Sequence, residues 1–147
     1  MTTIKNYLSL VKFSHTIFAM PFAIIGFVLG LKSNSNIQEI SNKEYGLKFM
    51  LVIICMITAR SAAMAFNRYL DRSFDSKNPR TAIREIPKGI ISANSALRFV
   101  IINCVVFIIA TYFINPICLY LSPVALFVIL FYSYTKRFTA LCHLVLG

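Results

Sequence analysis

The sequence FMLVIICMITARSAAMAF, residues 49–66, runs directly into NRYLDRSFDSKNPRTAIREIPKG, residues 67–89. The first part contains a single charged residue, Arg60, and has the length of about 17 to 25 residues that a helix needs to cross a bilayer. The second part holds nine of the chain's twenty charged residues. A membrane-crossing helix that ends in a dense cluster of charge is therefore predicted, and the rest of the fold is arranged around it.

The composition of the whole chain indicates a lipid environment. Of its 147 residues, 58% are hydrophobic and 14% are charged, with a mean hydropathy of +0.72. Soluble domains carry about 25% charged residues. Hydrophobic runs cover residues 13–31, 49–66, 99–114 and 117–134. They predict an all-α, multi-pass integral membrane bundle with four transmembrane helices in a single domain, residues 1–147.

The sequence around the four hydrophobic runs indicates what precedes the first span and how the last two spans are connected. The first run is too long for a signal peptide and no A-x-A site follows it, so a retained span is predicted. YLSLVKF, residues 7–13, is predicted to precede it as a short amphipathic helix at the interface. Asn115 and Pro116 predict a tight turn, which makes the last two spans an antiparallel hairpin.

Basic residues are distributed unequally between the two sides of the predicted bundle. If the spans alternate in direction, eleven Lys and Arg residues lie on the side that holds residues 67–96, and three lie on the other side. The positive-inside rule then places residues 67–96 in the cytoplasm. Because this charge flanks membrane helices and forms no soluble basic face, no nucleic-acid partner is expected.

Three oxygen-bearing side chains form a stripe at the end of the second run. Asn67, Asp71 and Asp75 are spaced i, i+4 and therefore share one helix face. Arg60 falls on nearly the same face, deeper in the membrane, where a charged residue is costly and indicates a functional site. Two carboxylates and an amide suit Mg²⁺, which proteins usually share with substrate phosphates. The stripe therefore predicts a Mg²⁺ site that opens at the cytoplasmic end of this helix.

Basic residues follow the stripe and complete a site for phosphate. They are Lys77, Arg80 and Arg84. Asn78 and Pro79 are predicted to end or bend the helix, and Thr81 to cap a new turn, so that the chain returns these bases over the acidic face. No P-loop or Gly-rich nucleotide motif occurs, so the phosphate is predicted to belong to a lipid such as an isoprenyl diphosphate.

Two other interpretations of the charged cluster stay open at this point. In the first, the cluster is a solvated helix end in which Asp71 and either Arg68 or Arg72 neutralise one another. In the second, the protein is a transporter with a buried Arg and Asp pair. The second predicts charged residues that face one another in other spans, and residues 99–114 and 117–134 contain none.

The sequence ARSAAMAFNRYLDRSFDSKNPRTAIREIPKGIIS, residues 59–92, resembles the first aspartate-rich motif of the UbiA superfamily of intramembrane prenyltransferases. The similarity is strongest to the 4-hydroxybenzoate polyprenyltransferase branch. KFSHTIFAMPFA, residues 12–23, and YSYTKRFTALCHLVLG, residues 132–147, also resemble this family. The resemblance implies a membrane protein of the bacterial inner membrane with its active site facing the cytoplasm.

The activity implied by the resemblance is the Mg²⁺-dependent transfer of a polyprenyl group from a prenyl diphosphate to an aromatic acceptor in quinone biosynthesis. The acceptor is expected to be 4-hydroxybenzoate or a similar ring, with a dihydroxynaphthoate-like ring as the alternative. Asn67, Asp71 and Asp75 are implied to bind Mg²⁺ with the diphosphate, and Lys77, Arg80 and Arg84 to hold the phosphates. Lys136 and Arg137 match a K-R pair that is implied to lie near the acceptor; equally, they could be a positive-inside anchor.

This chain departs from the family pattern in two respects. The family often reads R-P-L-P-x-G where this chain has Glu85 after Arg84, and Glu85 is expected to alter the charge of the loop without touching the stripe. The family is also similar over about nine helices and carries a second aspartate-rich motif. We therefore expect the chain to be the N-terminal part of such an enzyme, inactive alone; the alternative is a noncatalytic membrane or lipid-binding remnant.

Overall fold

Five helices make up the part of the chain that the computed structural model describes, residues 2–33 and 42–135. They are α1 (Thr2–Leu10), α2 (Phe13–Ser33), α3 (Asn42–Asp75), α4 (Ala93–Ile114) and α5 (Pro116–Thr135). In these residues no strand occurs. The helices α2 to α5 are each long and apolar enough to cross a membrane. The predicted all-α bundle with four membrane-crossing helices is confirmed.

The helix α3 is longer than the hydrophobic run that predicted it. It begins at Asn42 and continues through the charged cluster as far as Asp75. The next helix begins at Ala93, where the side chain of Ser92 accepts a hydrogen bond from the backbone N–H of Ser95 (3.1 Å) and so caps the helix N-terminus. Residues 67–96 are therefore partly helical, and the connector between α3 and α4 consists of residues 76–92 alone.

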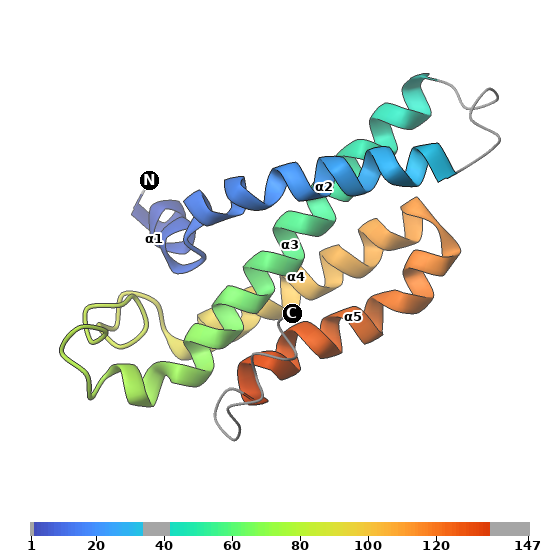
Figure 1. The fold of residues 1–147 in the computed structure, drawn as a ribbon. Helices are drawn as coiled ribbons and strands as arrows, with labels where there is room; N and C mark the ends of the chain where they lie inside the picture. Colours follow the sequence, from blue (N-terminus) through green and yellow to red (C-terminus); the bar gives the residue numbers. More distant parts are fainter. Residues whose placement is uncertain (1, 34–41, 136–147) are drawn as a thin grey trace.

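The long helix α3 forms the axis against which the other helices pack (Figure 1). The helix α4 lies along α3, α5 turns back beside α4, and α2 crosses α3. At the turn, Asn115 Oδ1 accepts a hydrogen bond from the backbone N–H of Ile117 (3.0 Å), and Pro116 occupies the first position of α5. The antiparallel hairpin predicted at Asn115 and Pro116 is therefore present.

The buried core is concentrated at the end of the bundle that holds the connector. Its members come from α1, α3, the connector and α4: Leu10, Ala62, Ala65, Ile86, Ile91, Ala96 and Val100. The three alanines are fully buried, and small side chains of this kind let the backbones of α3 and α4 approach closely. The connector thus contributes two isoleucines to the core, which fixes its course over the end of α3.

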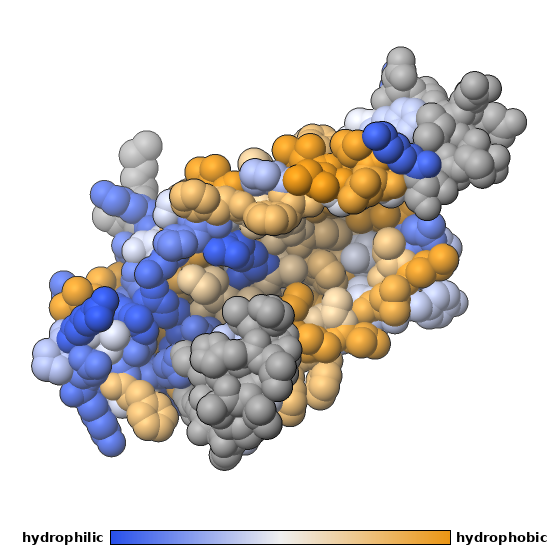
Figure 2. Space-filling view, in the orientation of Figure 1, coloured by the Kyte–Doolittle hydropathy of each residue, from blue (hydrophilic) through white to orange (hydrophobic). Residues whose placement is uncertain are grey.

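The helices α2 and α5 expose large apolar side chains. Phe18, Phe22 and Tyr120 are each more than three-quarters exposed. Figure 2 shows hydrophobic residues over α2 and α5, whereas hydrophilic residues gather at the end formed by α1 and the connector. Apolar faces of this extent require lipid or further helices as their surroundings.

The short helix α1 meets α2 at a sharp break. Lys12 has a φ of 46°, a left-handed backbone conformation that ends α1 and redirects the chain into α2. Leu10 and Val11 are buried at this point, and the Tyr7 ring lies 5.0 Å from that of Phe99 in α4. The predicted lead-in at residues 7–13 is therefore a helix followed by a turn, and it packs against the bundle.

Candidate functional site

The predicted stripe lies on the last turns of α3. This helix is continuous through Asn67, Asp71 and Asp75, so the three residues follow one another at intervals of one turn. Asn67 and Asp71 are half-buried, and Asp75 is buried, with 7% of its surface exposed. Asn67 and Asp71 both interact with neighbouring groups. The spacing from which the stripe was inferred is present, and its role in metal binding stays a prediction.

The connector folds back over the end of α3, as the sequence predicts, but Thr81 acts differently. Its hydroxyl donates to the backbone carbonyl of Asp75 (3.0 Å), the last residue of α3, and so satisfies a carbonyl that has no partner within the helix. Asn78 Oδ1 accepts from the backbone N–H of Arg80 (3.0 Å) and forms the tight turn in front of it. The cap predicted at the start of a new turn is therefore a cap at the end of α3.

Asp75 and Arg84 form an ion pair. Arg84 Nη1 donates to both carboxylate oxygens of Asp75, at 2.9 and 2.8 Å. The sequence predicts a metal ligand at Asp75 and a phosphate ligand at Arg84, and the structure brings these two side chains together. One nitrogen of the guanidinium makes both bonds, so the other N–H donors of Arg84 remain for additional acceptors.

A second ion pair, which was not predicted, joins three parts of the chain. Arg68 Nη1 on α3 donates to Glu85 Oε2 on the connector (3.3 Å), and the Ser9 hydroxyl on α1 donates to Glu85 Oε1 (2.5 Å). The Arg68 and Glu85 side chains are 8% and 15% exposed. Glu85 thus pairs with Arg68 and Ser9, neither of which belongs to the stripe, and it links the connector to α1 and α3 as well as altering the charge of the loop. The one signal of this pairing in the sequence was that Glu85 is one of the few acids in a basic cluster.

The interpretation of the cluster as a solvated helix end assumed that Asp71 pairs with either Arg68 or Arg72. Arg68 is paired with Glu85, and the Arg72 guanidinium lies over the Tyr69 ring, 4.3 Å from its centroid. Arg72 also donates to the backbone carbonyl of Tyr69 (2.7 Å). Both arginines therefore have partners besides Asp71, which itself interacts with neighbouring groups.

A cavity of about 350 Å³ lies between α1, α3 and the connector. Its walls are formed by Ser9, Lys12, Arg68, Arg80, Thr81, Ile83, Arg84 and Glu85. Four basic side chains thus face this space with one carboxylate, so it favours an anion. We refer to it as the cationic cavity. Lys77 is exposed at the end of α3 and does not line it.

Arg60 lies deeper in α3 than the stripe, as the sequence predicts. It is half-buried, and its Nε is buried with no hydrogen-bond partner in the part of the chain that the structure describes. A buried donor of this kind usually has a partner, either another protein group or an ordered water. This favours the prediction that Arg60 faces a polar space. Lys136 and Arg137, the residues predicted near the acceptor, lie outside the described residues.

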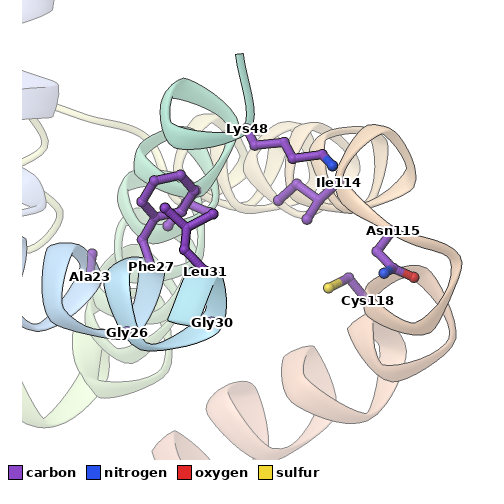
Figure 3. A pocket seen from close by; sticks show the side chains of 10 residues that line it. Ala23, Gly26, Phe27, Gly30, Leu31, Lys48, Ile114, Asn115 and Cys118 are labelled. Atoms are coloured by element: carbon purple, nitrogen blue, oxygen red, sulfur yellow. The ribbon is translucent and has the colours of Figure 1, made fainter. Parts of the chain in front are cut away.

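A larger cavity lies far from these groups. It has a volume of about 480 Å³ and opens between the end of α2 and the turn from α4 to α5 (Figure 3). Gly26, Gly30 and Phe27 line it from α2, and Lys48, which is paired with Glu44 at 2.9 Å, lines it from α3. This cavity is at the opposite end of α3 from Asp75, so size alone does not identify the candidate site.

The stripe has the donor chemistry for part of a Mg²⁺ coordination shell. Asn67, Asp71 and Asp75 offer one amide and two carboxylates, whereas Mg²⁺ takes about six oxygen ligands. Among the described residues no group of three or more His, Cys, Asp and Glu side chains could hold a metal ion. These residues fit one side of a Mg²⁺ site, and the remaining ligands would be water, phosphate or other protein groups.

Comparison with known proteins confirms the resemblance in the sequence. Residues 19–147 match the profile of the UbiA prenyltransferase family. Proteins named 4-hydroxybenzoate octaprenyltransferase are similar to the chain. The one from Tolumonas auensis is 36% identical over 88 residues, which are 60% of this chain and 31% of that protein. The one from Polynucleobacter asymbioticus is 39% identical over 101 residues, 67% of this chain and 34% of that protein.

The fold is also similar to a solved structure. The apo structure of a UbiA homologue from Aeropyrum pernix superimposes with a TM-score of 0.73 at 32% sequence identity. The match covers 91% of this chain and 45% of that chain. The present chain therefore spans less than half of the solved homologue and about a third of the curated relatives it matches.

Proposed function

Since the chain belongs to the UbiA prenyltransferase family, we propose that it supplies one wall of an active site that transfers a polyprenyl group from a prenyl diphosphate to an aromatic acceptor. The observation that carries this proposal is the end of α3. There, Asp75 at the end of a membrane-crossing helix is paired with Arg84, and Arg84 lines the cationic cavity. A lipid diphosphate likewise carries its charge at one end and an apolar tail at the other, so its head would lie at the cavity and its tail among the helices.

The residues of this wall would bind and orient the diphosphate. Arg80 and Arg84 line the cationic cavity, and the planar guanidinium group suits phosphate oxygens. Asp75 holds Arg84 through one nitrogen, which leaves the other donors of Arg84 for the phosphates. Lys77, in the same connector, is exposed and would add a further positive charge. These basic side chains would therefore stabilise the negative charge that develops on the diphosphate as it leaves.

Asn67, Asp71 and Asp75 would hold Mg²⁺ together with the diphosphate. When bound, this ion supplies Lewis-acid stabilisation of the charge on the leaving group. The allylic C–O bond of the prenyl diphosphate would break with its electron pair leaving on the diphosphate, and apolar side chains around the tail would keep water from the allylic carbocation. A carbon of the electron-rich acceptor ring would then bond to this carbocation, and the same ring carbon would release its proton to water or to the oxygen of the acceptor.

The acceptor that we propose is 4-hydroxybenzoate or a close analogue, in a pathway of quinone biosynthesis. The names of the relatives support it. A dihydroxynaphthoate-like ring is the alternative. Arg60 carries positive charge suited to the diphosphate, and Lys136 with Arg137 charge suited to the acceptor; these roles stay predictions. Side-by-side assays with both acceptors distinguish the two rings.

Four apolar helices and the family make the chain an integral membrane protein. We place it in a bacterial inner membrane with the stripe on the cytoplasmic side. The eleven Lys and Arg residues on the side of the connector support this orientation. Prenyl diphosphate can then bind from the cytoplasmic interface while its tail stays among the helices.

The test is transfer of a labelled prenyl chain to 4-hydroxybenzoate by membranes that contain the full-length protein. We expect transfer to require Mg²⁺, and Asp71→Ala and Asp75→Ala to reduce it by about a hundredfold or more, because each removes a ligand of the leaving-group site. Glu44→Gln, which breaks the exposed pair with Lys48 at the other end of α3, is the control and should leave the rate unchanged.

Full activity of either Asp variant would rule out the proposed role of the stripe. A wild-type protein that binds prenyl diphosphate but transfers nothing to any acceptor would instead favour a noncatalytic lipid-binding protein. Binding is measured separately, by equilibrium partition of the labelled diphosphate with and without Mg²⁺.

A further inference from the structure

We propose that Glu85 is a positioning residue that holds the connector, and with it Arg80 and Arg84, over the end of α3. This inference rests on the proposed function for its kinetic consequence, but its structural basis is independent. At Glu85, α1, α3 and the connector exchange polar side-chain contacts through a single carboxylate.

The two oxygens of the Glu85 carboxylate have different partners. Oε1 accepts from the Ser9 hydroxyl at the end of α1, and Oε2 accepts from Arg68 Nη1 on α3. The following residue, Ile86, is 9% exposed and packs in the core with Leu10 and Ala65. Glu85 and Ile86 therefore anchor the middle of the connector by a polar and an apolar contact side by side.

Charge makes this anchor necessary. Arg68 is 7% exposed and shares the cationic cavity with Lys12, Arg80 and Arg84. Glu85 is the one carboxylate that lines this cavity. Without it, Arg68 would be a buried cation without its carboxylate, and the bases of the connector would repel it. The connector would then move away from α3 to lower this repulsion.

Movement of the connector would alter the site itself. Arg84 follows Asp75, the last residue of α3, by nine positions, and its side chain reaches Asp75 because the connector folds back. Glu85 is the adjacent residue, so it sets the distance of the Arg84 backbone from α3. We therefore expect loss of Glu85 to weaken binding of the prenyl diphosphate more than binding of the aromatic acceptor.

The test compares Glu85→Gln, Glu85→Asp and Ser9→Ala in the full-length protein, with Glu44→Gln as the control. In Glu85→Gln, the KM for prenyl diphosphate should rise about tenfold, the effect of losing a hydrogen bond to a charged group, while the KM for the acceptor stays within about twofold. Glu85→Asp keeps the charge and should recover most of the loss. Ser9→Ala removes only the link to α1 and should give a smaller rise in the KM for prenyl diphosphate than Glu85→Gln.

A second measurement needs no enzyme activity. Trypsin cleaves after Lys77, Arg80, Arg84 and Lys88, which all lie in the connector. If Glu85 holds the connector down, cleavage of Glu85→Gln in membranes should be about five to ten times faster than cleavage of the wild type and of Glu44→Gln, because local opening controls cleavage. A variant that failed to fold would also be cleaved within α3 and α4, which the fragment masses reveal.

The outcomes separate the two proposals. If the wild type transfers prenyl groups but Glu85→Gln keeps both its KM and its rate of cleavage, the positioning role is overturned and the proposed function stands. If the wild type is inactive but Glu85→Gln is cleaved faster, the positioning role stands and the proposed function fails. Equal rises in both KM values, without recovery in Glu85→Asp, also overturn the positioning role, because they indicate general damage.

Discussion

The pair of Asp75 and Arg84 joins the end of α3 to the connector at the candidate site. The Asp75 side chain is 9% exposed and the Arg84 side chain 34%, so water screens the pair from the Arg84 side. Both oxygens of Asp75 are nevertheless engaged, at 2.9 and 2.8 Å. A carboxylate held in this way is oriented before a ligand arrives, but a metal ion must share it with Arg84.

This pair is expected to show measurable but modest coupling. In a double-mutant cycle of Asp75→Asn and Arg84→Gln, the interaction free energy should be about 1 kcal/mol, at the upper end of the range for partly exposed pairs. The measurement is unfolding of the purified protein in detergent micelles by added denaturing detergent. Strictly additive effects of the two substitutions would show that the pair contributes no stability.

The connector is shaped by its backbone as much as by its charges. Gly89 has a φ of 75°, and its N–H donates to the carbonyl of Ile86 (3.0 Å). Two residues later, the N–H of Ile91 donates to the carbonyl of Glu85 (3.1 Å). This left-handed turn returns the chain to the core just before α4 begins. Glycine is the residue that adopts this conformation without steric strain.

Replacement of glycine by alanine should have opposite effects at two positions. A Cβ added at Gly89 or at Gly46 would meet no atom within 4 Å. Any difference between the two substitutions in the free energy of unfolding is therefore due to the backbone conformation. Gly89→Ala should lower the free energy of unfolding by about 1 kcal/mol because of the left-handed φ. Gly46→Ala, in the helix α3, should raise it by about 0.5 to 1 kcal/mol because alanine favours helix.

Thermal unfolding in detergent, followed by circular dichroism, measures both variants. Asparagine tolerates the left-handed region better than alanine, so Gly89→Asn should lie between Gly89→Ala and the wild type. A destabilised Gly46→Ala, or an unchanged Gly89→Ala, would contradict this account of the turn.

The molecule as a whole is divided into a polar end and apolar sides. The connector and α1 carry the hydrophilic surface, and the exposed faces of α2 and α5 are rich in Phe, Ile and Tyr (Figure 2). The two ends of α3 therefore lie in different environments. Asp75 is at the polar end with the connector, and Asn42 is at the end where α2 finishes (Figure 1).

The predicted orientation can be tested by labelling from each side of the membrane. Lys77→Cys and Lys43→Cys place a thiol at opposite ends of α3, and a membrane-impermeant maleimide reports which one is accessible. In intact cells or right-side-out vesicles, we expect Lys43→Cys to react at least about tenfold faster than Lys77→Cys, with the reverse in inverted vesicles. Signals are compared with those of the parent protein, which contains four cysteines. The opposite pattern would place the stripe outside the cytoplasm.

The helices and the stripe could be predicted from the sequence because both depend on residues close together in the chain. A run of apolar residues has a length that suits a bilayer, and an i, i+4 spacing becomes a helix face wherever the helix continues. The last turns of α3 are polar, so hydrophobicity did not predict them; the i, i+4 stripe, followed by Asn78 and Pro79, predicted that the helix continues to about Asp75.

The pairing of the charges depended on the three-dimensional fold. The cluster at residues 67–89 contains six bases and three acids, which can pair in many ways of similar free energy. Burial of Leu10 and Ile86 selects one of them, because it brings the connector and α1 onto α3. Glu85 then meets Arg68, seventeen positions away, and Ser9, seventy-six positions away. Local spacing specifies a helix face, whereas a contact between distant residues exists only after the segments that carry them have packed.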